Sequence, residues 1–192
     1  MKRPDLGAGA VILFAMSLLL LPLRWIVAWS IAAVVHEVCH YLAVRVCGGV
    51  VSGIRVGATG ARMDVGGLGH WQEVFCALAG PAGGIMLLSV ARWCPRVAIC
   101  ALAQSLFNLL PVYPLDGGRA MRCAIRAVLP ACVAFRVCDI MQRGALLGLV
   151  IIGLYSSVFL RAGIVPGLGA LLLAIRWFPV KRPCISEVFS VQ

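Results

Sequence analysis

Long apolar runs dominate this sequence and limit it to folds that place them in a lipid bilayer. Hydrophobic residues make up 62% of the 192 positions and charged residues only 12%, whereas a soluble domain averages about 45–50% and 25%. A membrane-spanning helix needs about 20 mostly apolar residues. We therefore expect a single-domain, all-α polytopic membrane protein with about six transmembrane helices. The expected spans are Leu6–Leu23, Trp25–Cys47, Trp71–Arg92, Val97–Val112, Gly144–Leu160 and Gly163–Phe178.

Two segments between these spans have a different character. Gly48–Gly69 is rich in glycine and in β-favouring Val, Ile and Thr, so it predicts a small β-hairpin or loop insertion after the second span. Leu115–Arg143 carries five arginines and predicts a basic, interfacial or cytoplasmic helical connection. Only a short tail, Pro179–Gln192, follows the last span.

The positive charge is distributed as a topology signal. The net charge is +10, but the basic residues lie singly between apolar runs, which argues against nucleic acid as a partner and for contacts with anionic lipid. If the N-terminus is cytoplasmic, 13 of the 17 Lys and Arg residues fall on the cytoplasmic side. Those outside would be Arg24, Arg92, Arg96 and Arg161. This asymmetry predicts both termini in the cytoplasm.

The second span contains a metal-binding pattern, His36-Glu37-Val38-Cys39-His40. Residues four apart share one helix face, so His36 and His40 can reach one ion, and Glu37 can take a proton from a metal-bound water. With three His and three Glu in the chain, chance gives this pattern with a probability of about 0.0007. Zinc is the default ion for such a helix. The alternative is a polar cluster satisfied by neighbouring helices without a metal.

A catalytic zinc usually takes a third protein ligand. His70 lies at the border of a loop and a helix, and a ligand role there stays open. Asp116 follows two prolines that break the fourth helix and precedes Gly117 and Gly118, which allow a tight turn. A helix broken at membrane depth lines a protein or water-filled cavity, so Asp116 could turn towards a metal. The alternative is a helix cap or an acid in an interfacial turn.

These motifs together resemble the site-2 protease family of intramembrane zinc metalloproteases. That family pairs an HExxH helix with a later Asn- and Pro-rich LDG helix end, here His36–His40 and Asn108–Gly117. Ala79-Gly80-Pro81 is similar to the family's AGP element at the start of the third span. The similarity covers roughly Trp25–Arg143. The leading extra span, the run Pro114–Arg119 and the span count look most like the branch of the stage IV sporulation FB protease, which processes a membrane-associated sigma-factor precursor.

The resemblance implies a role for each matching residue. His36, His40 and Asp116 would bind Zn²⁺, Glu37 would activate the water, and Asn108 would hold the substrate peptide or the developing oxyanion. The substrate would be a membrane protein, cleaved in the bilayer of a bacterial cytoplasmic membrane. Whether a regulatory membrane partner takes part stays open. Neither the CBS domain nor the PDZ-like insert of some relatives is expected.

Two positions depart from the family pattern. The family usually has Gly before the second His, where this chain has Cys39, and it often has Asn shortly after the AGP element, where this chain has Gly83-Gly84. Two other functions stay open, and these departures support the first of them. One is a non-cleaving, metal-binding membrane scaffold or pseudoprotease. The other is a metal transporter, which would instead need polar residues along a path through several helices.

Overall fold

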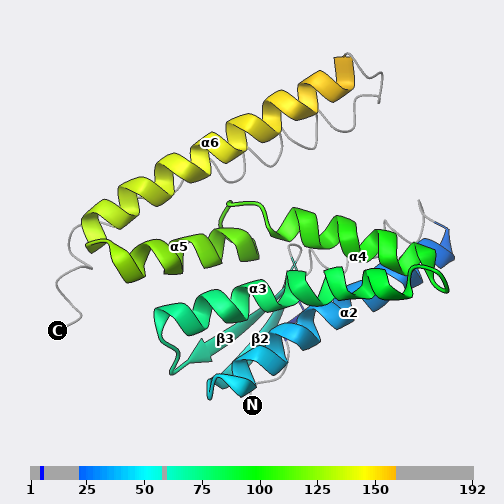
Figure 1. The fold of residues 1–192 in the computed structure, drawn as a ribbon, viewed down its shortest axis with the longest axis horizontal. Coiled ribbons are helices and arrows are strands. Elements are labelled where there is room, and N and C mark those ends of the chain that lie inside the picture. The colour runs from blue at the N-terminus through cyan, green and yellow to red at the C-terminus, as the bar shows by residue number, and fades with distance from the viewer. Residues whose placement is uncertain (1–4, 7–21, 58–59, 159–192) are drawn as a thin grey trace. The chain divides into compact units, whose positions relative to one another are not determined.

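The computed structural model describes residues 5–6, 22–57 and 60–158. The chain divides into two units, Met1–Ala131 and Cys132–Gln192. In chain order the elements are β1 (Asp5–Leu6), α2 (Leu23–Val46), β2 (Val50–Gly57), β3 (Gly60–Gly66), α3 (His70–Met86), the 3-10 turn η1 (Leu87–Val90), α4 (Pro95–Asn108), α5 (Asp116–Val128) and α6 (Ala131–Val158) (Figure 1). Residues 7–21 of the expected first span, the expected sixth span Gly163–Phe178 and the tail lie outside the described residues.

Three described helices are long and apolar enough to cross a membrane. They cover Leu23–Val46, His70–Val90 and Ala131–Ser157. On α2, large apolar side chains such as Trp29 and Ile31 are exposed while small ones such as Ala28 and Ala32 are buried. This is the reverse of a soluble helix, and it suits a helix that faces lipid on one side and close-packed helices on the other. The chain is accordingly a membrane protein.

Helix α4 is shorter than the span expected at Val97–Val112. It has 14 residues and ends at Asn108, so it is about 21 Å long at 1.5 Å per residue, against roughly 30 Å of hydrocarbon. The count of six spans therefore stays a prediction. The described part of the chain has three helices that meet the length and hydropathy needed for a span.

Helix α6 differs from expectation at its start. The sequence predicts a basic connection up to Arg143 and a fifth span from Gly144, but one helix of 28 residues runs over Ala131–Val158. The basic residue that suggested the division, Arg143, forms an ion pair with Asp139 one turn earlier, at 2.8 Å between Nη2 and Oδ2. Because the pair neutralises the charge within the helix, an arginine there does not end it. The residues expected to form the basic connection are therefore divided between α5 and the first part of α6.

The hairpin expected after the second span is confirmed. Strands β2 and β3 pair antiparallel from Val50 opposite Gly66 to Gly57 opposite Gly60, with an irregularity between Val51 and Gly53. The two-residue strand β1 adds in parallel to β2, so the sheet order is β1-β2-β3 and β3 lies at an edge among the described strands. Gly48 and Gly67 flank the hairpin with φ of 77° and 81°, a conformation that glycine adopts without strain.

Helix α2 packs against two other helices of the first unit, α3 and α4, and α3 in turn packs against α5 (Figure 1). Its N-terminal half meets α4 through the small residues Ala28, Ala32, Cys100 and Ala101. Its C-terminal half packs at Ala43 and Val44 against Cys76 of α3 and against side chains of the hairpin. Small side chains let helices approach closely in a membrane, and the His36 and His40 positions lie between these two contact regions.

Candidate metal centre

Three side chains from two distant parts of the chain converge on one point. His36 and His40 are both buried on α2, and their Nε2 atoms are 3.1 Å apart. Asp116, the first residue of α5, places Oδ2 3.0 Å from His36 Nε2 and 3.1 Å from His40 Nε2. Among the described residues these three form the group of His, Cys, Asp and Glu side chains able to hold a metal ion.

The size and chemistry of this triangle suit zinc. Zinc bonds histidine nitrogen and carboxylate oxygen at about 2.0–2.2 Å in tetrahedral geometry, which puts two ligand atoms roughly 3.3 Å apart. The observed separations of 3.0–3.1 Å between the three atoms are close to this value. Two imidazoles and one carboxylate are also a ligand set of catalytic zinc sites, in which a fourth position stays open for water or substrate.

The ring of His40 is oriented by a backbone group of α3. Its Nδ1 lies 2.7 Å from the carbonyl oxygen of Cys76. A carbonyl only accepts hydrogen bonds, so Nδ1 carries the proton and donates it, which leaves the Nε2 lone pair directed at the metal position. His36 Nδ1 is buried and has no hydrogen-bond partner among the described residues.

Gly80 allows α3 to lie against His40. A Cβ at this position would overlap the imidazole ring, including Nε2. The Ala79-Gly80-Pro81 element therefore serves the metal centre, although its expected place at the start of the third span is wrong. It lies in the middle of α3, which begins at His70. The close approach of the two helices is a tertiary contact, and the sequence signal for it is only a small residue in an apolar helix.

Two glycines also hold Asp116 in place, by a different route from the tight turn expected of them. Gly117 and Gly118 belong to the first turn of α5, and neither has a positive φ. A Cβ on Gly117 would overlap the Leu109 carbonyl, and one on Gly118 would overlap the backbone at Val112. Their missing side chains let the start of α5 press against the loop before it, which carries Asp116 to the two histidines.

The backbone before α5 explains why Asp116 is not simply a cap. The N-cap residue is Leu115, and no side-chain cap hydrogen bond is made there. Asp116 lies within the first turn, where the helix dipole stabilises a carboxylate, and its side chain is only 13% exposed. The described geometry thus favours the ligand reading of Asp116 over the capping alternative.

The remaining candidate residues lie at different distances from this point. Glu37 is half-buried on α2, directly after His36. Asn108 ends α4 and brings Nδ2 to 3.4 Å from His36 Nε2. His70 is exposed at the first residue of α3 and is not part of the metal-binding group. Sequence reasoning missed the Cys76 carbonyl, because every residue has a carbonyl and no sequence pattern marks the one that orients a ligand.

Fold and site together define a membrane protein with the site-2 protease fold and a buried site for a metal ion. The solved structure of the site-2 protease from Methanocaldococcus jannaschii matches with a TM-score of 0.62 over 93% of this chain and 90% of that chain, at 21% identity. At this identity the match establishes the fold and not the activity.

The comparison with curated proteins points the same way. The protein named "Putative zinc metalloprotease Rip3" of Mycobacterium tuberculosis, from strains Erdman and H37Rv, is 31% identical over 203 aligned residues that cover 90% of this chain. The alignment covers 44% of the Rip3 sequence, so the chain spans less than half the length of these relatives. No family model matches the chain.

Proposed function

We propose that this chain is an intramembrane zinc metalloprotease of the site-2 protease family. It would hydrolyse peptide bonds of a membrane-embedded or membrane-associated protein. The observation that carries the proposal is the convergence of His36, His40 and Asp116 on one point. The two histidines belong to a helix that is long and apolar enough to cross a membrane. The similarity to Rip3 and the shared site-2 protease fold support it.

Each residue near this point has a part in the proposed reaction. Bound Zn²⁺ would polarise both a water molecule and the scissile carbonyl. Glu37, beside His36 on α2, would take the proton of the water and later pass it to the leaving amine. Asn108 Nδ2, 3.4 Å from His36 Nε2, would donate a hydrogen bond to the substrate carbonyl oxygen as negative charge develops there.

The hairpin offers a way to hold the substrate in extended form. Peptide bonds inside a helix already have their carbonyls hydrogen-bonded, so a membrane helix must unwind before cleavage. Strand β3 (Gly60–Gly66) lies at the edge of the sheet among the described strands. An unwound substrate segment would pair with that edge through main-chain hydrogen bonds, as in other strand-addition complexes.

The decisive experiment is Glu37→Gln in the purified full chain. About one zinc per chain should be retained, while cleavage of a synthetic peptide library, read by mass spectrometry, should be abolished. Arg96→Gln, which changes an exposed residue of α4 outside the metal-binding group, is the control and should retain both. Cleavage by the Glu37→Gln protein would refute the mechanism.

The two alternatives predict different results in the same preparation. A scaffold or pseudoprotease would hold zinc without cleaving any peptide, and a transporter would move zinc across a vesicle membrane. Neither is favoured, because His36, His40 and Asp116 gather at one point among the described residues, and Glu37 directly follows His36 in the chain. Zinc flux into sealed vesicles distinguishes the transporter from the protease.

The proposal extends to the cellular setting. We place the chain in a bacterial cytoplasmic membrane with both termini cytoplasmic, on the charge asymmetry of its loops. Reporter fusions at each terminus test this orientation. On the resemblance to the stage IV sporulation FB branch, we also propose a membrane-associated sigma-factor precursor as substrate. Coexpression of this chain, or its Glu37→Gln variant, with such a precursor tests it, and a shortened product on an immunoblot is expected only with the unaltered chain.

A further inference from the structure

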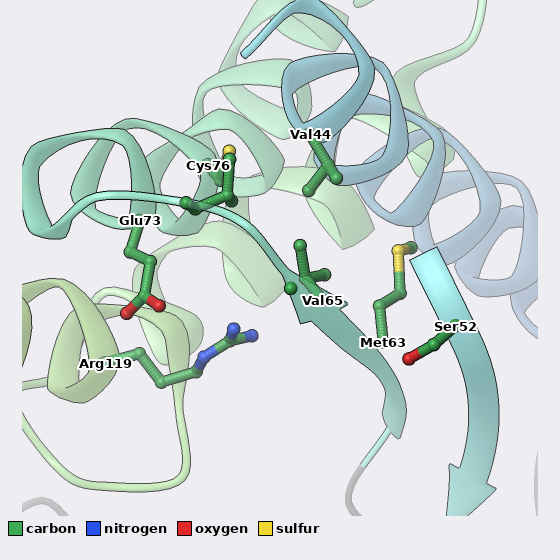
Figure 2. A pocket seen from close by; sticks show the side chains of 9 residues that line it. Val44, Ser52, Met63, Val65, Glu73, Cys76 and Arg119 are labelled. Atoms are coloured by element: carbon green, nitrogen blue, oxygen red, sulfur yellow. The ribbon is translucent and has the colours of Figure 1, made fainter. Parts of the chain in front are cut away.

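A cavity of about 370 Å³ lies beside the metal centre. Its walls come from α2, α3, α5 and the two hairpin strands. Val44, Met63 and Val65 form an apolar side, and Glu73 and Arg119 supply charged groups (Figure 2). This volume is at the lower end of the range for ligand sites, so it suits one long side chain better than a large ligand.

On two helices, α2 and α5, a residue that lines the cavity lies about one helical turn after a residue of the metal centre. Val44 follows His40 by four residues on α2, and Arg119 follows Asp116 by three on α5. One turn of helix is about 5.4 Å long. The third helix contributes Cys76, which lines the cavity and whose carbonyl binds His40. A peptide with its scissile bond at the metal position would therefore have a neighbouring side chain within reach of the cavity.

The hairpin can orient a substrate side chain towards the cavity. Met63 and Val65 are two residues apart on β3, so they lie on the same face of the sheet, and both line the cavity. A peptide strand added along the edge of β3 would lie about 4.8 Å away and present every second side chain to that face. The strand-addition geometry and the cavity are thus compatible with a single bound peptide.

The charged groups of the cavity define what that side chain can be. Figure 2 shows the carboxylate of Glu73 and the side chain of Arg119 on the same side of the cavity, with the guanidinium extending towards Val65. Cys123 Sγ donates a hydrogen bond to Glu73 Oε2 at 2.8 Å, which holds the carboxylate in position and leaves it capacity to accept further bonds. A basic side chain would be repelled by Arg119 and an acidic one by Glu73. A carboxamide avoids both penalties, because it donates through its nitrogen and accepts through its oxygen.

We propose that this cavity selects a substrate glutamine within a few residues of the scissile bond. The apolar stem would pack on Val44, Met63 and Val65. The amide nitrogen would donate to Glu73, and the amide oxygen would accept from Arg119. This inference rests on the proposed function, since it assumes that a peptide is bound at the metal centre.

Binding of peptide hydroxamates tests the inference without requiring cleavage. The hydroxamate anchors each peptide at the zinc of the full-length, zinc-loaded chain. A host peptide is made with Gln, Met, Glu or Lys at each of the three positions nearest the hydroxamate, and dissociation constants are measured by calorimetry. At one position, Gln should bind roughly tenfold or more tightly than Met, as expected for hydrogen bonds to charged groups.

Substitutions that remove the charge of Glu73 or Arg119 then show whether these residues recognise the substrate side chain or only stabilise the fold. Glu73→Gln leaves Arg119 unopposed, so the preference should move to the Glu peptide, while Arg119→Gln should move it to the Lys peptide. Each shift should be roughly tenfold relative to Met. Arg96→Gln changes an exposed arginine on α4 that does not line the cavity and should leave the order unchanged. Zinc content shows that each variant is folded.

The outcomes separate this inference from the proposed function. Equal binding of all four peptides at every position, or an order that neither cavity variant changes, overturns the glutamine site. A preference for Lys or Glu in the unaltered chain overturns it as well. Failure of the unaltered chain to cleave the peptide library contradicts the proposed protease activity. The peptide affinities still decide whether the cavity prefers glutamine.

Discussion

The thiol of Cys39 on α2 packs directly against the backbone of Gly83 on α3. A Cβ at Gly83 would overlap both Sγ and Cβ of Cys39. Cys39 is one departure from the site-2 protease pattern, and Gly83 belongs to the Gly83-Gly84 pair at the other. A larger residue beside His40 is accommodated because the facing helix has no side chain there. Cys39 and Gly83 therefore compensate one another in packing.

This packing makes a prediction for the pair. Gly83→Ala should lower stability by about 1–3 kcal/mol, the usual cost of overpacking, which is roughly 2–12 °C in Tm for a chain of this size. Adding Cys39→Gly should recover part of that loss because it removes the overlapping thiol, even though glycine in a helix itself costs about 1 kcal/mol. Thermal unfolding of the four proteins in detergent measures the coupling, and strictly additive effects would contradict the contact.

Gly80 should be needed for metal binding. In Gly80→Ala, the new methyl group would displace the His40 ring, and zinc affinity should fall by about 10–100-fold, the range found when a ligand loses its orientation. The matched control is Gly148→Ala on α6, where a Cβ would meet nothing within 4 Å, so zinc affinity should not change. Competition with a zinc-sensitive dye gives both affinities. Normal zinc binding by Gly80→Ala would show that α3 does not constrain the ligand.

The three proposed ligands should behave alike. His36→Ala, His40→Ala and Asp116→Ala should each lose bound zinc, whereas Glu37→Gln should keep it. Zinc at 100 times its dissociation constant stabilises a folded protein by about 2.7 kcal/mol, so a chelator should lower the Tm of the unaltered chain and leave that of the three variants nearly constant. Elemental analysis gives the zinc content. If Asp116→Asn binds zinc as tightly as the unaltered chain, the third ligand is wrongly assigned.

Cys123 should be resistant to alkylation at ordinary pH. Burial and the hydrogen bond to Glu73 raise the pKa of this thiol on α5 to about 12. The reactive form is the thiolate, so its labelling rate should still be rising at pH 10. Glu73→Gln removes the acceptor charge and should lower the pKa, which makes labelling faster at a given pH. Iodoacetamide treatment with mass-spectrometric mapping measures this, and the exposed Cys94 provides the reference for reagent activity.

Much of the membrane fold could be predicted because its signals are local. The apolar runs at α2 and α3 and the glycine- and valine-rich hairpin between them each depend on the residues of one segment. The start of α6 could not be placed in the same way. The charge of Arg143 indicates the end of a basic connection, whereas its pairing with Asp139 keeps it inside a helix that continues into the apolar run.

By itself the sequence determined that the chain enters a membrane and that His36 and His40 share one helix face, because hydropathy and the helical repeat depend only on neighbouring residues. Tertiary structure decided the rest of the site. Asp116 lies 80 positions after His36 and reaches it because Gly117 and Gly118 let α5 press on the preceding loop. The positions of Gly80 and the Cys76 carbonyl are set by how closely α3 approaches α2. Contacts of this kind depend on the packing of whole helices, and no local repeat in the sequence encodes them.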